Sequence, residues 1–188
     1  MGPAKTIGAG EIQTAITHLA SAIATRHGTE GKLILLGIAN GGIPLSRRLA
    51  LSLSKASPAI TAKCGTLDIS FHRDDIGRHP IPKEFTPTLL PADVNGATVI
   101  LVDDVLFSGR TVKAALDELF DHGRPAKVEL AVLVDRGHHR LPVTADYVGL
   151  QLATTAAEKV IVTLDEKNPA RDAIEIRPAP RPAGNAKR

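Results

Sequence analysis

Two adjacent aspartates at the end of an apolar run are the residues best suited to chemistry in this sequence. Asp103 and Asp104 stand in the stretch VILVDDVLFSGRT, residues 99–111, ahead of small and hydroxyl-bearing residues. Carboxylate oxygens accept hydrogen bonds from the hydroxyls of a vicinal diol, and they are also ligands that Mg²⁺ prefers. The pair therefore predicts a site for a sugar diol, where either aspartate could hold magnesium directly or through water.

The segment after the aspartates has the composition of an anion-binding loop. Residues 106–111 offer successive backbone N–H groups, the Ser108 and Thr111 hydroxyls, and a flexible Gly109 ahead of an expected helix. Backbone amides at such a turn and at a helix N-terminus attract negative charge. This loop suits a phosphate monoester, and a diol next to a phosphate describes a ribose 5-phosphate.

A purely structural explanation accounts for the aspartates equally well. In it, Asp103 and Asp104 cap the following helix, and Ser108 and Gly109 form a simple turn. A dinucleotide site of the Rossmann type fits less well, because no G-x-G-x-x-G is present and the acids precede the glycine. A P-loop is absent as well.

Hydrophobic periodicity predicts the elements that must position this segment. Ile12, Ile16, Leu19 and Ile23 recur at helical spacing, whereas residues 98–102 form the continuous apolar run of a strand buried on both faces. Strands alternating with helices indicate an α/β fold with a mainly parallel sheet, in which ligands bind at the carboxyl ends of the strands. The patterns predict helices over residues 11–26, 43–53 and 111–122, and strands over residues 32–38, 65–71, 98–102, 128–134, 147–150 and 159–164.

Two segments do not follow these periods. Residues 72–95 are rich in proline and charge, which predicts a long loop or flap within a single domain of residues 1–177. Residues 178–188 carry Arg181, Lys187 and Arg188 without any acid, which predicts a disordered basic tail. These three cations account for the formal net charge of +3, so the remainder is neutral and its charge does not indicate a nucleic-acid partner.

Composition excludes several classes of protein. No window is apolar enough to span a membrane, and the first residues lack the order of a signal peptide, so we expect a cytoplasmic protein. The single cysteine, Cys64, excludes an internal disulfide and is interpreted as a buried apolar residue. The adjacent His138 and His139 are expected in a surface turn rather than at a metal.

The stretch VILVDDVLFSGRT resembles the 13-residue signature for phosphoribosyl pyrophosphate (PRPP) of type I phosphoribosyltransferases. The segments DISFHRDD, GRPAKVELAVLVDRGHHRLPV, ADYVG and EKVIVTLDE also resemble the PyrR family of pyrimidine operon regulators and uracil phosphoribosyltransferases, over about residues 11–166. The resemblance implies a five-stranded parallel core with a small hood. It also implies conversion of uracil and PRPP to UMP and diphosphate with Mg²⁺.

The resemblance also implies roles for individual residues. Asp103 and Asp104 would hold the ribose hydroxyls and magnesium, and Arg73 in the flap would assist catalysis. Arg136 and the backbone of Val160 would contact the base, although without the resemblance they would be interpreted as a surface arginine and a core valine. Residues of the following loop would bind the 5-phosphate: Val105, Leu106, Phe107, Ser108, Gly109, Arg110 and Thr111. Phe107 stands where purine-using relatives carry an acid, which favours a pyrimidine.

Two departures from the family pattern bear on activity and on RNA. The diphosphate loop usually reads Gly-Ile-Lys-Thr-Arg-Gly, but residues 37–42 read GIANGG, which leaves the backbone amides of Asn40 and Gly41 to bind an anion. Several family cations for RNA contact are also replaced, so binding of pyrimidine-operon leader RNA should be weaker than in the family. The matching positions are Thr17, His18, Ser21, Arg26, His138, His139, Arg140, Thr144 and Leu150.

The sequence thus supports two hypotheses from different classes. The first is a uracil phosphoribosyltransferase that binds PRPP, uracil and UMP, and, as is common in the family, forms a homo-oligomer. The second is a nucleotide-sensing RNA attenuator or a weakly active paralogue that kept the ribose-phosphate site.

Overall fold

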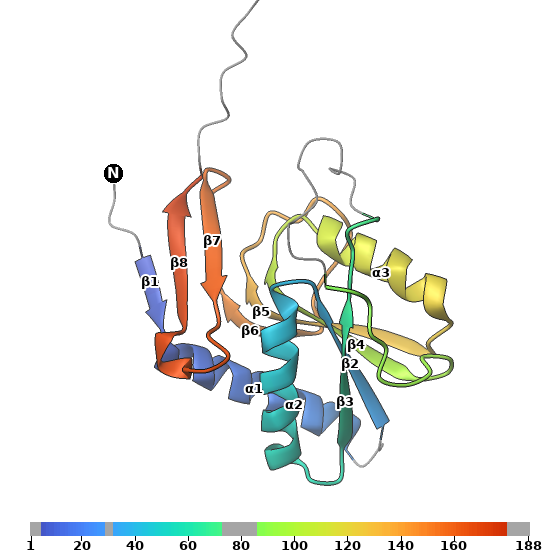
Figure 1. The fold of residues 1–188 in the computed structure, drawn as a ribbon. Coiled ribbons are helices and arrows are strands. Elements are labelled where there is room, and N and C mark those ends of the chain that lie inside the picture. Colours follow the sequence, from blue (N-terminus) through green and yellow to red (C-terminus); the bar gives the residue numbers. More distant parts are fainter. Residues whose placement is uncertain (1–4, 29–31, 73–85, 180–188) are drawn as a thin grey trace, which may run out of the picture.

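The computed structural model describes residues 5–28, 32–72 and 86–179 (Figure 1). The main sheet has five strands, all parallel, in the order β3-β2-β4-β5-β6. Its central strands are continuous apolar runs buried on both faces, as a parallel sheet requires. The bounds are β2 Lys32–Ile38, β3 Thr61–Leu67, β4 Thr98–Leu106, β5 Lys127–Asp135 and β6 Tyr147–Gln151.

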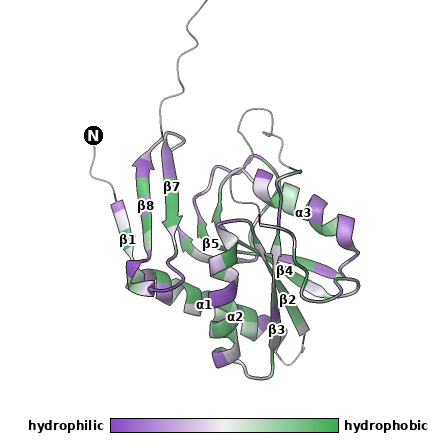
Figure 2. Cartoon of the chain, viewed as in Figure 1, coloured by the Kyte–Doolittle hydropathy of each residue, from purple (hydrophilic) through white to green (hydrophobic). Residues whose placement is uncertain are grey.

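Helices cover both faces of this sheet and form two hydrophobic cores. The helices α1 (Ala9–His27) and α2 (Gly42–Ala56) pack on one face, against alternate strand residues such as Leu35 and Val102. The helix α3 (Arg110–His122) packs on the other face, against the intervening residues such as Leu36 and Leu101. In Figure 2 the hydrophobic residues gather along the strands, and α3 is hydrophilic over much of its outer surface. The predicted α/β fold is confirmed.

A second, antiparallel sheet lies beside the main one (Figure 1). It has the order β1-β8-β7 and combines β1 (Lys5–Gly8), β7 (Glu158–Thr163) and β8 (Ala173–Pro178), with a short 3₁₀ helix at Pro169–Arg171 before β8. Of its strands, only β7 corresponds to a predicted one. The strands β1 and β8 are short, and β8 alternates buried Ile174 and Ile176 with more exposed residues, so neither has the continuous apolar run that marked the main strands.

Two predicted boundaries were wrong in ways that matter for the site. The strand expected over residues 65–71 is β3, which begins at Thr61 and ends at Leu67; it lies at the edge of the sheet, where half-exposed residues weaken the apolar signal. The strand expected over residues 98–102 continues to Leu106, so Asp103 and Asp104 lie within β4 rather than after it.

The structure tests only part of the predicted flap and none of the predicted tail. Residues 86–95 contain neither helix nor strand apart from a single β-bridge between Leu89 and Thr66. Residues 73–85, with Arg73, and residues 180–188 lie outside the described part of the chain. Among the helices of the described ranges, none is both long and apolar enough to cross a membrane.

Candidate active site

A cavity of about 370 Å³ opens at the carboxyl ends of β2 and β4, where a parallel sheet is expected to bind ligands. It collects eight of the predicted site residues from two segments of the chain. Ala39 and Ile69 also line it, and no chemical signal in the sequence distinguished these two. The predicted residues in its wall are Asn40, Gly41, Asp103, Asp104, Val105, Ser108, Arg110 and Thr111.

Two glycines bring the loop after β2 into contact with β4. A Cβ atom on Gly41 would lie 2.4 Å from the Asp104 carboxylate, and one on Gly42 would lie 2.0 Å from the carbonyl oxygen of Val102. Any larger residue would therefore move the loop away from the aspartates. The Ala39–Asn40 peptide bond in this loop is cis, and the Asn40 side chain accepts a hydrogen bond from the Thr86 hydroxyl at 3.2 Å. The two glycines thus allow the backbone of this loop to lie against β4 and the Asp104 carboxylate.

The carboxylate pair is buried in an environment that disfavours its negative charge. Asp103 is only 6% exposed, and its Oδ1 accepts a hydrogen bond from the backbone N–H of Asp104 at 3.0 Å. Burial raises the pKa of Asp103 well above its ordinary value, and the neighbouring Asp104 raises it further. Burial also raises the pKa of Asp104. A cation or hydroxyl donors would relieve this cost, so the pair is suited to a positive or hydrogen-donating ligand.

The same aspartates do not cap the following helix. The N-cap of α3 is Gly109, and it has no side-chain capping hydrogen bond. Gly109 has φ +87°, in the left-handed region that favours glycine, and it turns the chain from β4 into the helix. The capping explanation for Asp103 and Asp104 is therefore wrong, and the first N–H groups of α3 adjoin the cavity, where they can bind an anion.

The loop between β4 and α3 is held by hydrogen bonds from the segment after β5. The carbonyl oxygen of Ser108 accepts hydrogen bonds from the backbone N–H groups of Arg140 and Leu141, both at 3.1 Å. Leu106 is buried, and the Ser108 hydroxyl accepts from the backbone N–H of Arg110 at 3.4 Å. These bonds fix the backbone of the loop that lines the cavity. Of the seven loop residues predicted to bind phosphate, Leu106, Phe107 and Gly109 do not line the cavity wall.

Arg136 and Phe107 form a stacked pair beside this loop. The guanidinium carbon of Arg136 lies 4.2 Å from the centroid of the Phe107 ring, close enough for a cation–π interaction. Arg136 is 6% exposed; its Nε donates to the Thr154 hydroxyl at 3.1 Å and its Nη2 to the carbonyl oxygen of Thr155 at 2.9 Å. Burial lowers the pKa of Arg136. Arg136 is therefore not a surface residue, and the two threonines that orient it were missed by the sequence analysis.

Val160 is part of the hydrophobic core. Its side chain is 6% exposed, and its strand β7 pairs with β8, where Val160 lies opposite Ile176. The strand β7 also contacts β4. The prediction concerned the backbone of Val160, and its contact with a base stays a prediction. The role assigned to Arg73 falls outside the described residues.

The positions matched to RNA contact are not gathered on one patch. Arg26, near the end of α1, pairs with Glu129 at 3.2 Å and with Asp146 at 3.1 Å, close to the start of β5. His138 follows the opposite end of β5, where its ring meets the Phe107 ring edge-on at 6.4 Å. His138 therefore belongs to the surroundings of the stacked pair rather than to the face of α1.

The donors around Asp103 and Asp104 fit a magnesium ion. Mg²⁺ favours oxygen ligands from one or two carboxylates and takes its remaining ligands from water or substrate phosphates. Two neighbouring carboxylates that lie at the edge of an open cavity and resist being charged together meet this requirement.

Comparison with known proteins agrees with the architecture. Residues 8–167 match the model of the phosphoribosyl transferase domain. The chain is 43% identical over 177 residues to the bifunctional protein PyrR of Roseiflexus sp., covering 94% of this chain and 96% of that protein. It is 51% identical over 146 residues to the bifunctional protein PyrR of Corynebacterium glutamicum, covering 77% of this chain and 74% of that protein.

Solved structures with low sequence identity share the fold. The hypoxanthine phosphoribosyltransferase of Trypanosoma cruzi has a TM-score of 0.66 at 22% identity, covering 91% of this chain and 94% of that one. A hypoxanthine-guanine phosphoribosyltransferase from Bacillus anthracis has a TM-score of 0.61 at 20% identity, covering 79% of this chain and 84% of that one. The fold is thus that of the type I phosphoribosyltransferases, a class of transferases. Within this class, the chain belongs to the PyrR family.

Proposed function

We propose that the protein is a uracil phosphoribosyltransferase, which converts uracil and PRPP to UMP and diphosphate. The observation that carries the choice of base is the stacked pair of Phe107 and Arg136 beside the cavity. An aromatic ring cannot exchange a proton with a purine, whereas a buried guanidinium and a flat ring can hold the oxygen edge and face of a pyrimidine.

In the proposed reaction, the uracil nitrogen bonds to the ribose carbon and loses its proton to solvent or diphosphate, while the bond from that carbon to the diphosphate oxygen breaks and diphosphate leaves from the opposite side. The protein acts by position and charge, and no side chain forms a covalent intermediate. Asp103 and Asp104 accept hydrogen bonds from the ribose hydroxyls, and the loop of residues 105–111 binds the 5-phosphate with its backbone amides. The amides of Asn40 and Gly41 contact the diphosphate. Asp103 and Asp104 would hold a magnesium ion, directly or through water, and the ion would supply positive charge to the leaving diphosphate.

A panel of bases tests this proposal. The protein would be incubated with PRPP, Mg²⁺ and uracil, cytosine, hypoxanthine, guanine or adenine in turn, and nucleotide formation would be measured by chromatography. Uracil should be the preferred substrate. The variant Phe107→Asp should lose turnover with uracil, whereas Phe120→Asp, which removes a partly exposed ring on the outer side of α3, should not. Turnover with a purine and none with uracil would contradict the proposal.

A second candidate function is binding of pyrimidine-operon leader RNA, regulated by UMP. It is favoured by the name "bifunctional" of the related proteins and by the exposed Thr17, His18 and Ser21 on α1. The structure supplies little free positive charge there, because two carboxylates contact Arg26. We therefore expect weak binding whose salt slope is smaller by roughly 0.7 for each phosphate contact that is lost.

Filter binding over a salt series, with and without UMP, tests the RNA proposal. The reference is a PyrR relative that keeps the family cations. Tight binding with a steep salt slope and stimulation by UMP would show that regulation is intact. Binding of UMP without turnover of any base would make nucleotide sensing the function of the site.

A further inference from the structure

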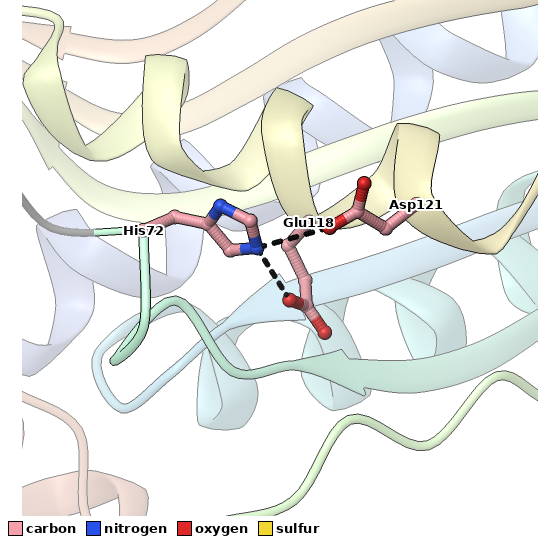
Figure 3. A group of neighbouring side chains, drawn as sticks. All are labelled: His72, Glu118 and Asp121. Atoms are coloured by element: carbon pink, nitrogen blue, oxygen red, sulfur yellow. Dashed lines mark ion pairs between the residues drawn. The ribbon is translucent and has the colours of Figure 1, made fainter.

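Three side chains of types that can ligate a metal ion converge between α3 and the segment after β3, and none of the three lines the cavity (Figure 3). The Nε2 atom of His72 lies 3.1 Å from Oε2 of Glu118 and 3.3 Å from Oδ2 of Asp121. His72 comes from the segment after β3, whereas Glu118 and Asp121 lie one turn apart on α3. One atom from each residue lies within 4.8 Å of the other two.

These separations suit a shared divalent ion. With metal–nitrogen and metal–oxygen bonds of about 2.0–2.2 Å, neighbouring ligand atoms are about 3.4 Å apart in tetrahedral geometry and about 2.9 Å apart at right angles. The two nitrogen–oxygen distances, 3.1 and 3.3 Å, fall inside this interval. The Asp121 side chain is 69% exposed, so it can rotate to bring its oxygen to the same distance from the Glu118 oxygen. The His72 side chain is 24% exposed, which leaves a path by which the ion can enter.

The central ligand of the cluster is itself held in place. The other oxygen of Glu118, Oε1, accepts a hydrogen bond from the Thr88 hydroxyl at 2.6 Å and lies 3.1 Å from Nε2 of His122. Such bonds orient a metal-ligating carboxylate and leave its second oxygen directed at the ion. Glu118 thereby contacts both His72, early in the connection between β3 and β4, and Thr88, later in the same connection.

We propose that His72, Glu118 and Asp121 bind one divalent transition-metal ion of the Zn²⁺ class, with water completing its coordination. The mixture of one imidazole and two carboxylates selects such an ion over Mg²⁺, which prefers oxygen alone. This site is separate from the Asp103–Asp104 pair and does not depend on the uracil reaction. In the absence of the ion, Nε2 of His72 contacts both carboxylates.

The ion would tie the end of the β3 segment to α3 next to the cavity. The backbone N–H of His72 donates to the carbonyl oxygen of Ile69 at 3.0 Å, and Ile69 lines the cavity wall. The role that follows is structural: the ion fixes a turn that supports the cavity and contributes no group to the reaction.

Calorimetry on untagged protein tests the site. The protein would be stripped with a chelator and titrated with Zn²⁺ in excess Mg²⁺, which occupies the oxygen-only sites. We expect one Zn²⁺ per chain and a rise in melting temperature on binding. The variants His72→Ala and Asp121→Asn should each weaken Zn²⁺ binding at least about tenfold. Co²⁺ in place of Zn²⁺ should give a visible spectrum of imidazole coordination that His72→Ala abolishes.

Matched controls separate this site from general surface binding. His18→Ala removes an exposed histidine from α1, and Asp117→Asn removes the acid that pairs with Lys113 on α3. Both should bind Zn²⁺ like the wild type. The proposal is overturned if stripped wild-type protein shows no saturable Zn²⁺ binding at about micromolar concentration. It is also overturned if His72→Ala and Asp121→Asn bind Zn²⁺ as the wild type does. Since both residues are partly exposed, these variants should fold even if changes at the more buried Glu118 do not.

Discussion

Two buried carboxylates on neighbouring strands of the same sheet have opposite electrostatic environments. Asp103 lies near the carboxyl end of β4, and Glu129 lies near the start of β5, opposite Ile100. They are 6% and 2% exposed. Burial raises the pKa of Asp103, and it would do the same at Glu129, but bonds with Lys127, Tyr147 and His27 outweigh it and lower the pKa of Glu129 to about 2.

The difference lies in the neighbours that the fold supplies. One oxygen of Glu129 is 2.6 Å from Nζ of Lys127 and 3.2 Å from Nε of Arg26; the other accepts from the Tyr147 hydroxyl at 2.7 Å and lies 2.8 Å from Nε2 of His27. In the described part of the chain, no ion pair involves Asp103. A buried carboxylate that is paired with side chains of the protein stabilises the fold. A buried carboxylate without such partners is available to bind a ligand.

The largest effect on stability is expected at Glu129. Because its pKa is lowered from 4.5 to about 2, its ionised form stabilises the fold by about 3 kcal/mol at neutral pH. This contribution is complete above the unfolded pKa and is lost as the pH falls through the folded one. Glu129→Gln should therefore lower the free energy of unfolding in urea by about that amount, while PRPP affinity of the folded protein stays unchanged.

The control for Glu129 is Glu166→Gln, which breaks an exposed ion pair with Arg47. It should change stability by less than about 1 kcal/mol. Equal effects of the two variants would show that the partners around Glu129 do not stabilise its charge.

The corresponding change at the site should affect binding rather than folding. Asp104→Asn removes a negative charge. That charge attracts magnesium, and it also strengthens the hydrogen bond from a ribose hydroxyl, so both ligands bind the carboxylate better than the amide. PRPP and UMP affinity, measured by calorimetry with Mg²⁺, should fall about 10- to 100-fold, while the melting temperature of the free protein should not fall. Unchanged PRPP affinity would remove Asp104 from the proposed site.

A smaller effect should come from moving the same carboxylate without changing its charge. Gly41→Ala places a methyl group 2.4 Å from the Asp104 carboxylate, which must then shift. PRPP affinity should fall by about 5- to 10-fold, or about 1 kcal/mol. Gly10→Ala is the matched control, because Gly10 is in helix α1 and, apart from its chain neighbours and the backbone of that helix, no atom lies within 4 Å of the added Cβ. If both variants bind PRPP alike, the close approach of Gly41 is not needed for the site.

The same contrast explains what the sequence could predict. The segment of residues 99–111 was identified because its residues are contiguous and each type indicates its role. The partners of Glu129 come from α1, β5 and β6, and their separation along the chain leaves no local pattern. Thr154 and Thr155 were missed for the same reason, since only folding brings them to Arg136.

Secondary structure was likewise predictable where its pattern is contiguous in the sequence. Buried parallel strands such as β4 and β5 have continuous apolar runs and were predicted almost to the residue at their starts. The strands β1 and β8 depend on each other, because Lys5 to Gly8 pair with Ala173 to Ile176 across most of the chain. Such pairing is decided by tertiary contacts, which a local pattern does not contain.

The last prediction reverses the usual effect of a core substitution. The raised pKa of Asp103 means that its ionised form destabilises the free protein, so the contribution of Asp103 to stability is greatest at low pH and is lost as the pH rises through the folded pKa. Asp103→Asn removes that charge, while the amide oxygen can still accept the hydrogen bond from the backbone N–H of Asp104. Without ligand, the variant should therefore be more stable than the wild type at neutral pH, by up to about 1 kcal/mol. With Mg²⁺ and PRPP the order should reverse, because these ligands stabilise only a protein that binds them. Thermal unfolding of both proteins with and without ligands measures this crossover. A variant that is less stable than the wild type in both conditions would show that the charge of Asp103 is already satisfied by the fold, as that of Glu129 is.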